Sequence, residues 1–121
     1  MRGEESGLRL ICDSAVLVEG GDGLRFEVVW RGEKAAAFAV RQGGRVYAYF
    51  NRCAHVPMEL DWNPGKFRDL SGLYLICATH GALYLPENGH CIAGPCKGRF
   101  LEKLPVEERD GKVYVNTSKA I

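Results

Sequence analysis

Apolar, β-branched and aromatic residues recur along this chain in short runs that alternate with glycine, asparagine and aspartate. Runs of this kind, bounded by turn-forming residues, are typical of β-strands. The helical period is not sustained over any long stretch. We therefore predict an all-β fold with antiparallel pairing. The expected strands cover residues 8–12, 24–30, 34–40, 46–50, 73–76, 83–85, 99–104, 106–108 and 112–115.

Short polar dipeptides that contain glycine mark the tightest expected turns. These are Gly43-Gly44, Asn88-Gly89 and Asp110-Gly111. Glycine reaches the positive φ angles that two-residue hairpins require. The last hairpin is expected to bring the chain back beside its opening strand. This order predicts a single domain with a base of residues 1–50 and 98–121 and a smaller part, residues 51–97, inserted into it.

Length, charge and cysteine number narrow the possible functions. The 121 residues suit one domain with a hydrophobic core of its own. Because 16 basic residues face 15 acidic ones, the chain has no charge excess for binding nucleic acid or an anionic membrane. The opening residues lack a secretion signal, and no apolar run is long enough to span a bilayer, so a soluble, cytoplasmic protein is expected. Five cysteines, an odd number, do not suit a fully paired disulfide framework.

Two short motifs carry the candidate chemistry. The first is Cys53-Ala54-His55 and the second is Cys77-Ala78-Thr79-His80-Gly81. Each offers one thiolate and one imidazole, and both could lie on neighbouring loop tips of a β-rich domain. A tetrahedral zinc could accept this set, although zinc fingers usually take both cysteines from one element and both histidines from another. A site at which each loop contributes one ligand of each kind is the alternative.

This Cys-x-His and Cys-x-x-His-Gly pattern resembles the signature of the Rieske [2Fe-2S] family. The resemblance covers about residues 8–116, including the Asn88-Gly89 hairpin and the segment at Gly94-Pro95. It implies a Rieske-like β-sandwich with an inserted cluster-binding subdomain. It also implies one [2Fe-2S] cluster per chain, with two thiolates on one iron and two imidazoles on the other. The implied ligands are Cys53, His55, Cys77 and His80.

The resemblance implies a ferredoxin that carries one electron between a flavoprotein reductase and a terminal oxygenase or similar acceptor. The sequence has no Ser/His/Asp set, phosphate loop or nucleotide motif, so we expect no catalysis of its own. A Rieske-like small or regulatory subunit of a larger oxidoreductase, such as nitrite reductase, is the second reading. A zinc-stabilised interaction domain is the third. The donor, the acceptor, the pathway and the oligomeric state stay open.

The family also implies how the redox potential is set. High-potential members place a serine two residues after the second histidine and a tyrosine four residues after it. Here these positions are Ala82 and Tyr84, so Tyr84 is expected to donate to a ligand sulfur without a serine partner. Those members also join their two loops by a disulfide at positions occupied here by Met58 and Thr79. We expect a potential toward the lower part of the family range, about −150 to +300 mV, that falls at high pH.

Other residues have more than one interpretation. Cys91 and Cys96 are read as reduced thiols in a packed turn, as a local disulfide, or as part of a four-thiolate site with Cys53 and Cys77. The segment between the motifs, residues 56–76, is longer than usual for the family and holds Trp62 and Phe67 among its aromatics. It is expected to form a lid, part of a docking face, or a surface bulge.

Two single residues complete the expectations. Cys12, on the first expected strand, is assigned to the core. His90 lies beside a hairpin turn and is expected to be a solvated side chain.

Overall fold

The computed structural model describes residues 8–30, 32–52, 60, 65–69, 71–77 and 81–116, with only the backbone of Trp30. Within these ranges the regular structure is nine strands and one three-residue 3-10 helix. The elements are β1 (Leu8–Asp13), η2 (Ser14–Val16), β2 (Leu24–Trp30), β3 (Glu33–Gln42), β4 (Arg45–Phe50), β5 (Leu75–Ile76), β6 (Leu83–Tyr84), β7 (Cys91–Ala93), β8 (Val106–Arg109) and β9 (Lys112–Asn116). The all-β prediction is confirmed.

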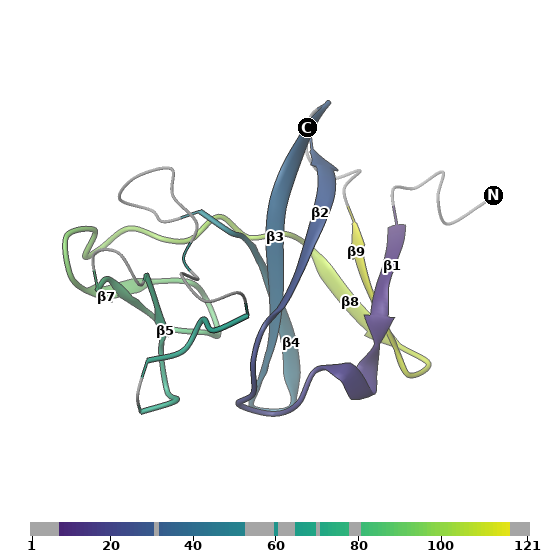
Figure 1. Ribbon diagram of the computed structural model, residues 1–121, viewed down its shortest axis with the longest axis horizontal. Helices are drawn as coiled ribbons and strands as arrows, with labels where there is room; N and C mark the ends of the chain where they lie inside the picture. Colours follow the sequence, from purple (N-terminus) through teal and green to yellow (C-terminus); the bar gives the residue numbers. More distant parts are fainter. Residues whose placement is uncertain are drawn as a thin grey trace.

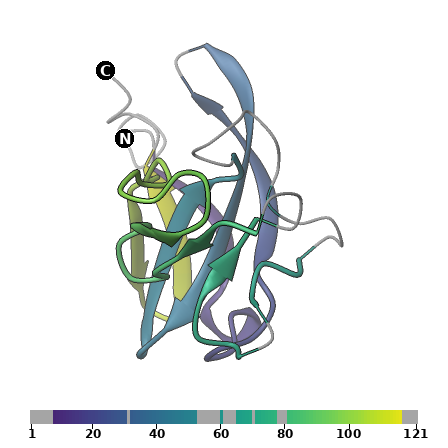
Figure 2. The same cartoon turned by 90° about the vertical axis from the view of Figure 1, so that its left-hand side faces the viewer.

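The strands form three antiparallel sheets of three strands each. Their orders are β1-β9-β8, β2-β3-β4 and β5-β6-β7. In Figure 1 the β2-β3-β4 sheet stands in the middle, with β1, β8 and β9 on one side and β5 and β7 on the other. The pairing of β1 with β9 confirms that the end of the chain returns to its opening strand. Figure 2 shows the β5-β6-β7 sheet from its outer side, in front of the other two.

The middle sheet is buried on both faces because the alternate side chains of a strand point to opposite sides. On β3, Phe38 and Val40 join one buried cluster, whereas Ala37 and Ala39 join another. On β4, Tyr49 faces the first cluster while Ala48 and Phe50 face the second. The middle sheet therefore separates two hydrophobic cores.

Each core belongs to one pair of sheets. The base core lies between the middle sheet and the β1-β9-β8 sheet, and it includes Val28, Leu104, Val113 and Val115. The second core, here called the site core, lies between the middle sheet and the small β5-β6-β7 sheet. Its members are Phe38, Val40, Tyr49, Leu60, Phe67, Leu75, Cys77, Ala82, Tyr84, Cys91, Cys96 and Leu101. Small alanines on one face of β3 and large residues on the other show that the strand is shaped for two different partners.

One expected strand is wrong, and one strand was not expected. Residues 99–104 make only isolated bridges, at Phe100 with His90 and at Lys103 with Tyr49. The reason is that this segment crosses from the small sheet to the middle sheet, so its pairing partner changes before a ladder can form. The unexpected strand is β7, which pairs with β6. Directly after β1 the chain forms the short helix η2, Ser14–Val16.

Two of the predicted hairpin turns have the backbone geometry that their residues suggest. Gly43 and Gly44 have φ angles of 61° and 81°. Asp110 and Gly111 have φ angles of 53° and 74°. Two successive positive φ angles define the type I′ turn, which matches the twist of the flanking strands.

No helix among the described residues is long and apolar enough to cross a membrane.

Candidate functional site

Of the four predicted ligands, the structure describes Cys77. It follows β5 directly, its side chain is fully buried, and it belongs to the site core. The other three, Cys53, His55 and His80, lie outside the described residues. What the structure gives is therefore the framework on which both ligand loops are mounted.

The second loop is closed by backbone hydrogen bonds at its base. The Cys77 N–H donates to the Ala82 carbonyl at 2.9 Å, and the Gly81 N–H donates to the Cys77 carbonyl at 2.7 Å. Gly81 has a φ of 73°, which a residue with a Cβ rarely adopts. These bonds fix the positions of the residues at the two ends of the loop, and His80 lies in the sequence between them.

The first loop is closed by a side chain. Asn51 follows β4, is 4% exposed, and is the one buried polar side chain recorded within the described residues. Its Oδ1 accepts a hydrogen bond from the backbone N–H of buried Leu60 at 2.8 Å. The Asn51 N–H donates to the Ala36 carbonyl on β3 at 2.9 Å. The residues that flank Cys53 and His55 in sequence are thus tied to each other and to the middle sheet.

The described part of the segment between the motifs is packed against the rest of the chain. Phe67 is fully buried and stacks on Phe38 of β3, with ring centroids 4.0 Å apart and planes at 13°. The Ile76 N–H of β5 donates to the Phe67 carbonyl at 2.8 Å. A Cβ on Gly23, the residue before β2, would lie 2.5 Å from the Phe67 ring. The backbone at Gly23 therefore packs directly against this side chain. Around Phe67 the surface-bulge interpretation is therefore wrong, and Trp62 lies outside the described residues.

Arg68, next to Phe67, also fixes the segment between the motifs, through four hydrogen bonds. Its guanidinium donates to the carbonyls of Gly21 at 2.8 Å and Arg41 at 3.0 Å, to Oε1 of Gln42 at 2.8 Å, and to the Gly72 carbonyl at 3.3 Å. Burial lowers the pKa of this guanidinium because the charged form loses hydration. The group nonetheless remains a cation, since an arginine is protonated at any physiological pH. It joins the loop before β2, the end of β3 and the lead-in to β5.

The segment after β7 lies directly on the second loop. A Cβ added to Gly94 would come within 2.7 Å of the Ala82 Cα, and the φ of Gly94 is 97°. Only glycine satisfies both conditions without a shift in the backbone. Gly94 therefore lies against Ala82, the residue that closes the second loop.

Tyr84 points its hydroxyl into the site core. It is fully buried, and its hydroxyl lies 3.1 Å from Sγ of Cys96, where either group is able to donate. The expected donation from Tyr84 to a ligand sulfur stays a prediction. The sequence alone did not suggest the contact between Tyr84 and Cys96, because Cys96 lies twelve positions later and in a turn.

The remaining cysteines and His90 are now placed. None of the four described cysteines, Cys12, Cys77, Cys91 and Cys96, forms a disulfide in this structure. Cys91 and Cys96 are buried thiols, which confirms the packed-turn interpretation. Cys12 is half-buried against the base core, and burial raises its pKa. His90 is partly buried and stacks on Phe100 with centroids 4.7 Å apart, so the expectation of a solvated side chain is wrong.

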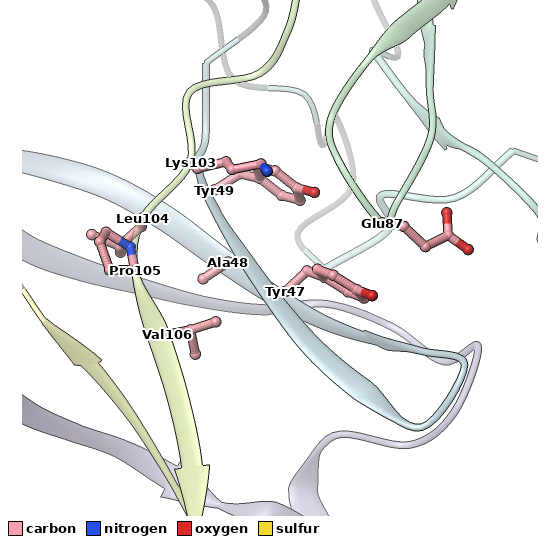
Figure 3. A pocket seen from close by; sticks show the side chains of 8 residues that line it. All are labelled: Tyr47, Ala48, Tyr49, Glu87, Lys103, Leu104, Pro105 and Val106. Carbon is pink, nitrogen blue, oxygen red and sulfur yellow. The ribbon is translucent and has the colours of Figure 1, made fainter.

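A pocket of about 260 Å³ lies beside β4. Figure 3 shows its lining: Tyr47, Ala48, Tyr49, Glu87, Lys103, Leu104, Pro105 and Val106. The Tyr49 hydroxyl donates to the Pro86 carbonyl at 2.7 Å, and burial raises its pKa above the ordinary value. The pocket therefore combines an apolar floor at Ala48, Leu104 and Val106 with the polar side chains of Glu87 and Lys103.

Within the described residues, no group of three or more histidine, cysteine, aspartate or glutamate side chains is arranged to hold a metal ion. The donor set in the sequence and the two closed loops nevertheless fit a two-iron cluster. Cys77 is a buried thiol at the base of the second loop, and a thiolate is a suitable ligand for the iron of such a cluster. The loop-closing role of Asn51 was missed from the sequence, although its place two residues before Cys53 was a usable signal.

Known proteins resemble the chain as follows. The family model of the Rieske [2Fe-2S] domain matches residues 9–115. No curated protein matches it in sequence.

Among solved structures, a chain from the complex of reduced oxygenase and oxidized ferredoxin in carbazole 1,9a-dioxygenase is 26% identical, with a TM-score of 0.69. That match covers 88% of this chain and 98% of the other. The terminal oxygenase of carbazole 1,9a-dioxygenase from Novosphingobium sp. KA1 is also 26% identical, with a TM-score of 0.69, over 93% of this chain and 30% of that one. A chain from a fluorene-bound complex of the oxygenase and ferredoxin is 20% identical, with a TM-score of 0.74, and this chain spans 29% of its length.

Proposed function

This chain belongs to the Rieske [2Fe-2S] domain family, and from that premise we propose that it is a ferredoxin, a one-electron carrier to a terminal oxygenase or similar acceptor. The observation that carries the proposal is the match of the domain over residues 9–115, nearly the whole chain. A solved chain of similar length, matched over 98% of itself, comes from a complex of oxygenase and ferredoxin. The role proposed is electron transfer without bond chemistry of its own.

We propose that Cys53, His55, Cys77 and His80 hold one [2Fe-2S] cluster. When bound, such a cluster accepts and releases a single electron. The chain's own contribution is to fix the ligands and exclude water. The burial of Cys77 and the two loop closures, at Asn51 with Leu60 and at Cys77 with Ala82, support this assignment.

Two further residues are proposed to shape the site. Tyr84, a buried residue of β6, is proposed to donate its hydroxyl hydrogen to a ligand sulfur; among the described residues its hydroxyl lies 3.1 Å from Cys96 Sγ. Ala82 lacks the hydroxyl that high-potential family members have at this position. Fewer donors toward sulfur stabilise the reduced, more negative site less, so the potential is proposed to lie toward the lower part of the family range.

We propose that residues 1–50 and 98–121 are the base and that residues 51–97 are the cluster-binding part. The β5-β6-β7 sheet falls within the second range, and the middle sheet supports it through the site core.

Electrochemistry of the purified protein tests the carrier function. The expected result is one reversible one-electron couple, within about −150 to +300 mV. Its potential should be flat near neutral pH and fall as pH rises, because ligand imidazoles lose protons more easily when the iron is oxidised. Cys77→Ser is the control and should lose the couple. A protein without any reversible couple would contradict the proposal, and a tight stoichiometric complex with a larger oxidoreductase would indicate a subunit instead.

A further inference from the structure

Two thiols outside the predicted ligand set face each other inside the site core. Cys91 is the first residue of β7, and Cys96 lies in the turn that follows that strand. Their sulfurs are 2.9 Å apart, and the residues are 0% and 1% exposed. A disulfide bond is about 2.04 Å long, so the sulfurs must approach by only about 0.9 Å. We propose that Cys91 and Cys96 are a site of reversible disulfide formation.

The backbone already holds the two residues in one compact loop. The Cys91 N–H donates to the Arg99 carbonyl at 2.7 Å, and the Gly98 N–H donates to the Cys91 carbonyl at 3.0 Å. The Arg99 N–H donates to the Cys96 carbonyl at 2.9 Å. A crosslink between residues whose separation is already fixed needs little backbone movement.

An oxidant reaches the pair through a surface turn. Cys96 is buried, but Gly94 and Pro95 before it and Lys97 and Gly98 after it are exposed. Its side chain therefore points from an exposed turn into the protein interior. A local opening of this turn is enough to admit a small neutral molecule such as hydrogen peroxide. A bulky oxidant would require a larger opening of the site core.

The reaction balances with peroxide as the oxidant. One thiol attacks a peroxide oxygen, the O–O bond breaks, and a sulfenic acid and one water form. The second thiol then attacks the sulfenic sulfur, forms the S–S bond and releases a second water. Two sulfurs are oxidised, one peroxide is reduced, and both thiol hydrogens leave in water. An external dithiol reverses the change by thiol-disulfide exchange.

Disulfide formation would change the hydrogen bond between Tyr84 and Cys96. As a thiol, Cys96 is able to donate to or accept from the Tyr84 hydroxyl, 3.1 Å away. As half of a disulfide it has no hydrogen to donate, so the hydroxyl becomes the only donor of the pair. The crosslink itself needs no cluster, so it can be tested independently of the proposed electron transfer.

Peptide mapping of the whole purified protein tests the crosslink. The folded protein is treated with hydrogen peroxide, alkylated in denaturant and cleaved after glutamate. Cleavage after Glu87 and Glu102 releases residues 88–102, which contain Cys91 and Cys96 and no other cysteine. The expected peptide is unalkylated and lighter by two hydrogens, and it becomes doubly alkylated when dithiothreitol precedes alkylation. Cys91→Ala and Cys96→Ala should abolish this species.

The same digest supplies the control and the contrary outcomes. Cys12 falls on another peptide and reports general oxidation of a half-buried thiol. The proposal is overturned if peptide 88–102 stays doubly alkylated after peroxide, if it gains sulfinic or sulfonic oxygen without a crosslink, or if either cysteine is instead joined to Cys77. The wild-type peptide decides the matter even if a variant does not fold.

Discussion

The side chain of Asn51 does at the first loop what backbone hydrogen bonds do at the second. Its Oδ1 holds the Leu60 N–H at 2.8 Å, whereas the second loop is closed by the bond from the Cys77 N–H to the Ala82 carbonyl at 2.9 Å. A backbone closure survives most substitutions. A contact made by one side chain does not, so we expect substitution of Asn51 to weaken the contact that the described residues make across the first loop.

Replacing Asn51 by alanine tests this difference. The Leu60 N–H would lose its acceptor while it stays buried, and an unsatisfied buried donor costs about 1–3 kcal/mol. We expect Asn51→Ala to lower the free energy of unfolding by about that amount and to reduce the iron retained after purification. Denaturant unfolding and iron analysis measure the two effects. Asn51→Asp keeps an acceptor and should lose less, while an alanine variant equal to wild type in both would refute the role.

At the scale of elements, β3 links the two halves of the molecule. Phe38 points from it into the site core and Ala37 into the base core. Two anchors attach to it from other parts of the chain. Phe67 stacks on Phe38. Near the end of β3, Arg41 forms an ion pair with Glu108 of β8.

Phe67 should be the stronger of the two anchors. It is fully buried, and phenylalanine-to-alanine changes in cores cost about 3–5 kcal/mol. We expect Phe67→Ala to lower the free energy of unfolding by about that much and to loosen the lead-in to β5. Phe100→Ala is the matched control, because Phe100 is 56% exposed and should cost less than about 1 kcal/mol. Equal losses for the two variants in denaturant unfolding would contradict the packing described.

The second anchor should depend on pH. The Arg41 guanidinium donates to both Glu108 oxygens, at 3.1 Å and 2.5 Å, and this lowers the pKa of Glu108 from 4.5. A lowered pKa in the folded state adds stability above about pH 4.5, and this stability is lost as pH falls further and the carboxylate is protonated.

Comparing Glu108→Gln with wild type measures this contribution. The ion pair is partly exposed, so wild type should exceed Glu108→Gln by no more than about 1 kcal/mol at neutral pH. The difference should shrink toward zero as pH falls well below 4.5. Arg41→Lys keeps the positive charge but loses the paired donors of the guanidinium. In an Arg41→Lys background, the stability lost on Glu108→Gln should therefore be smaller. A difference that grows on acidification would contradict the pairing.

For the whole molecule, the sequence predicts strand positions where a single pairing persists. Alternating runs with glycine turns gave β2 and β4 almost to the residue, because each pairs along its length with β3. The strand predicted at residues 99–104 is absent because the chain changes its pairing partner there, from one sheet to another. A local pattern of apolar and polar residues carries no information on such a change. The roles of Asn51 and Arg68 were equally hidden, since each depends on a contact between distant segments. The ligand set, by contrast, stays a prediction that rests on the family resemblance of the Cys-x-His and Cys-x-x-His-Gly motifs.

The central claim is that this framework holds two irons and two sulfides. Joint analysis of iron and acid-labile sulfide in protein purified anaerobically from iron-replete cells tests it most directly. We expect about two of each per chain, a red-brown colour, and loss of both elements in Cys77→Ser. A colourless protein that contains zinc, or neither iron nor sulfide, under those conditions would contradict the account.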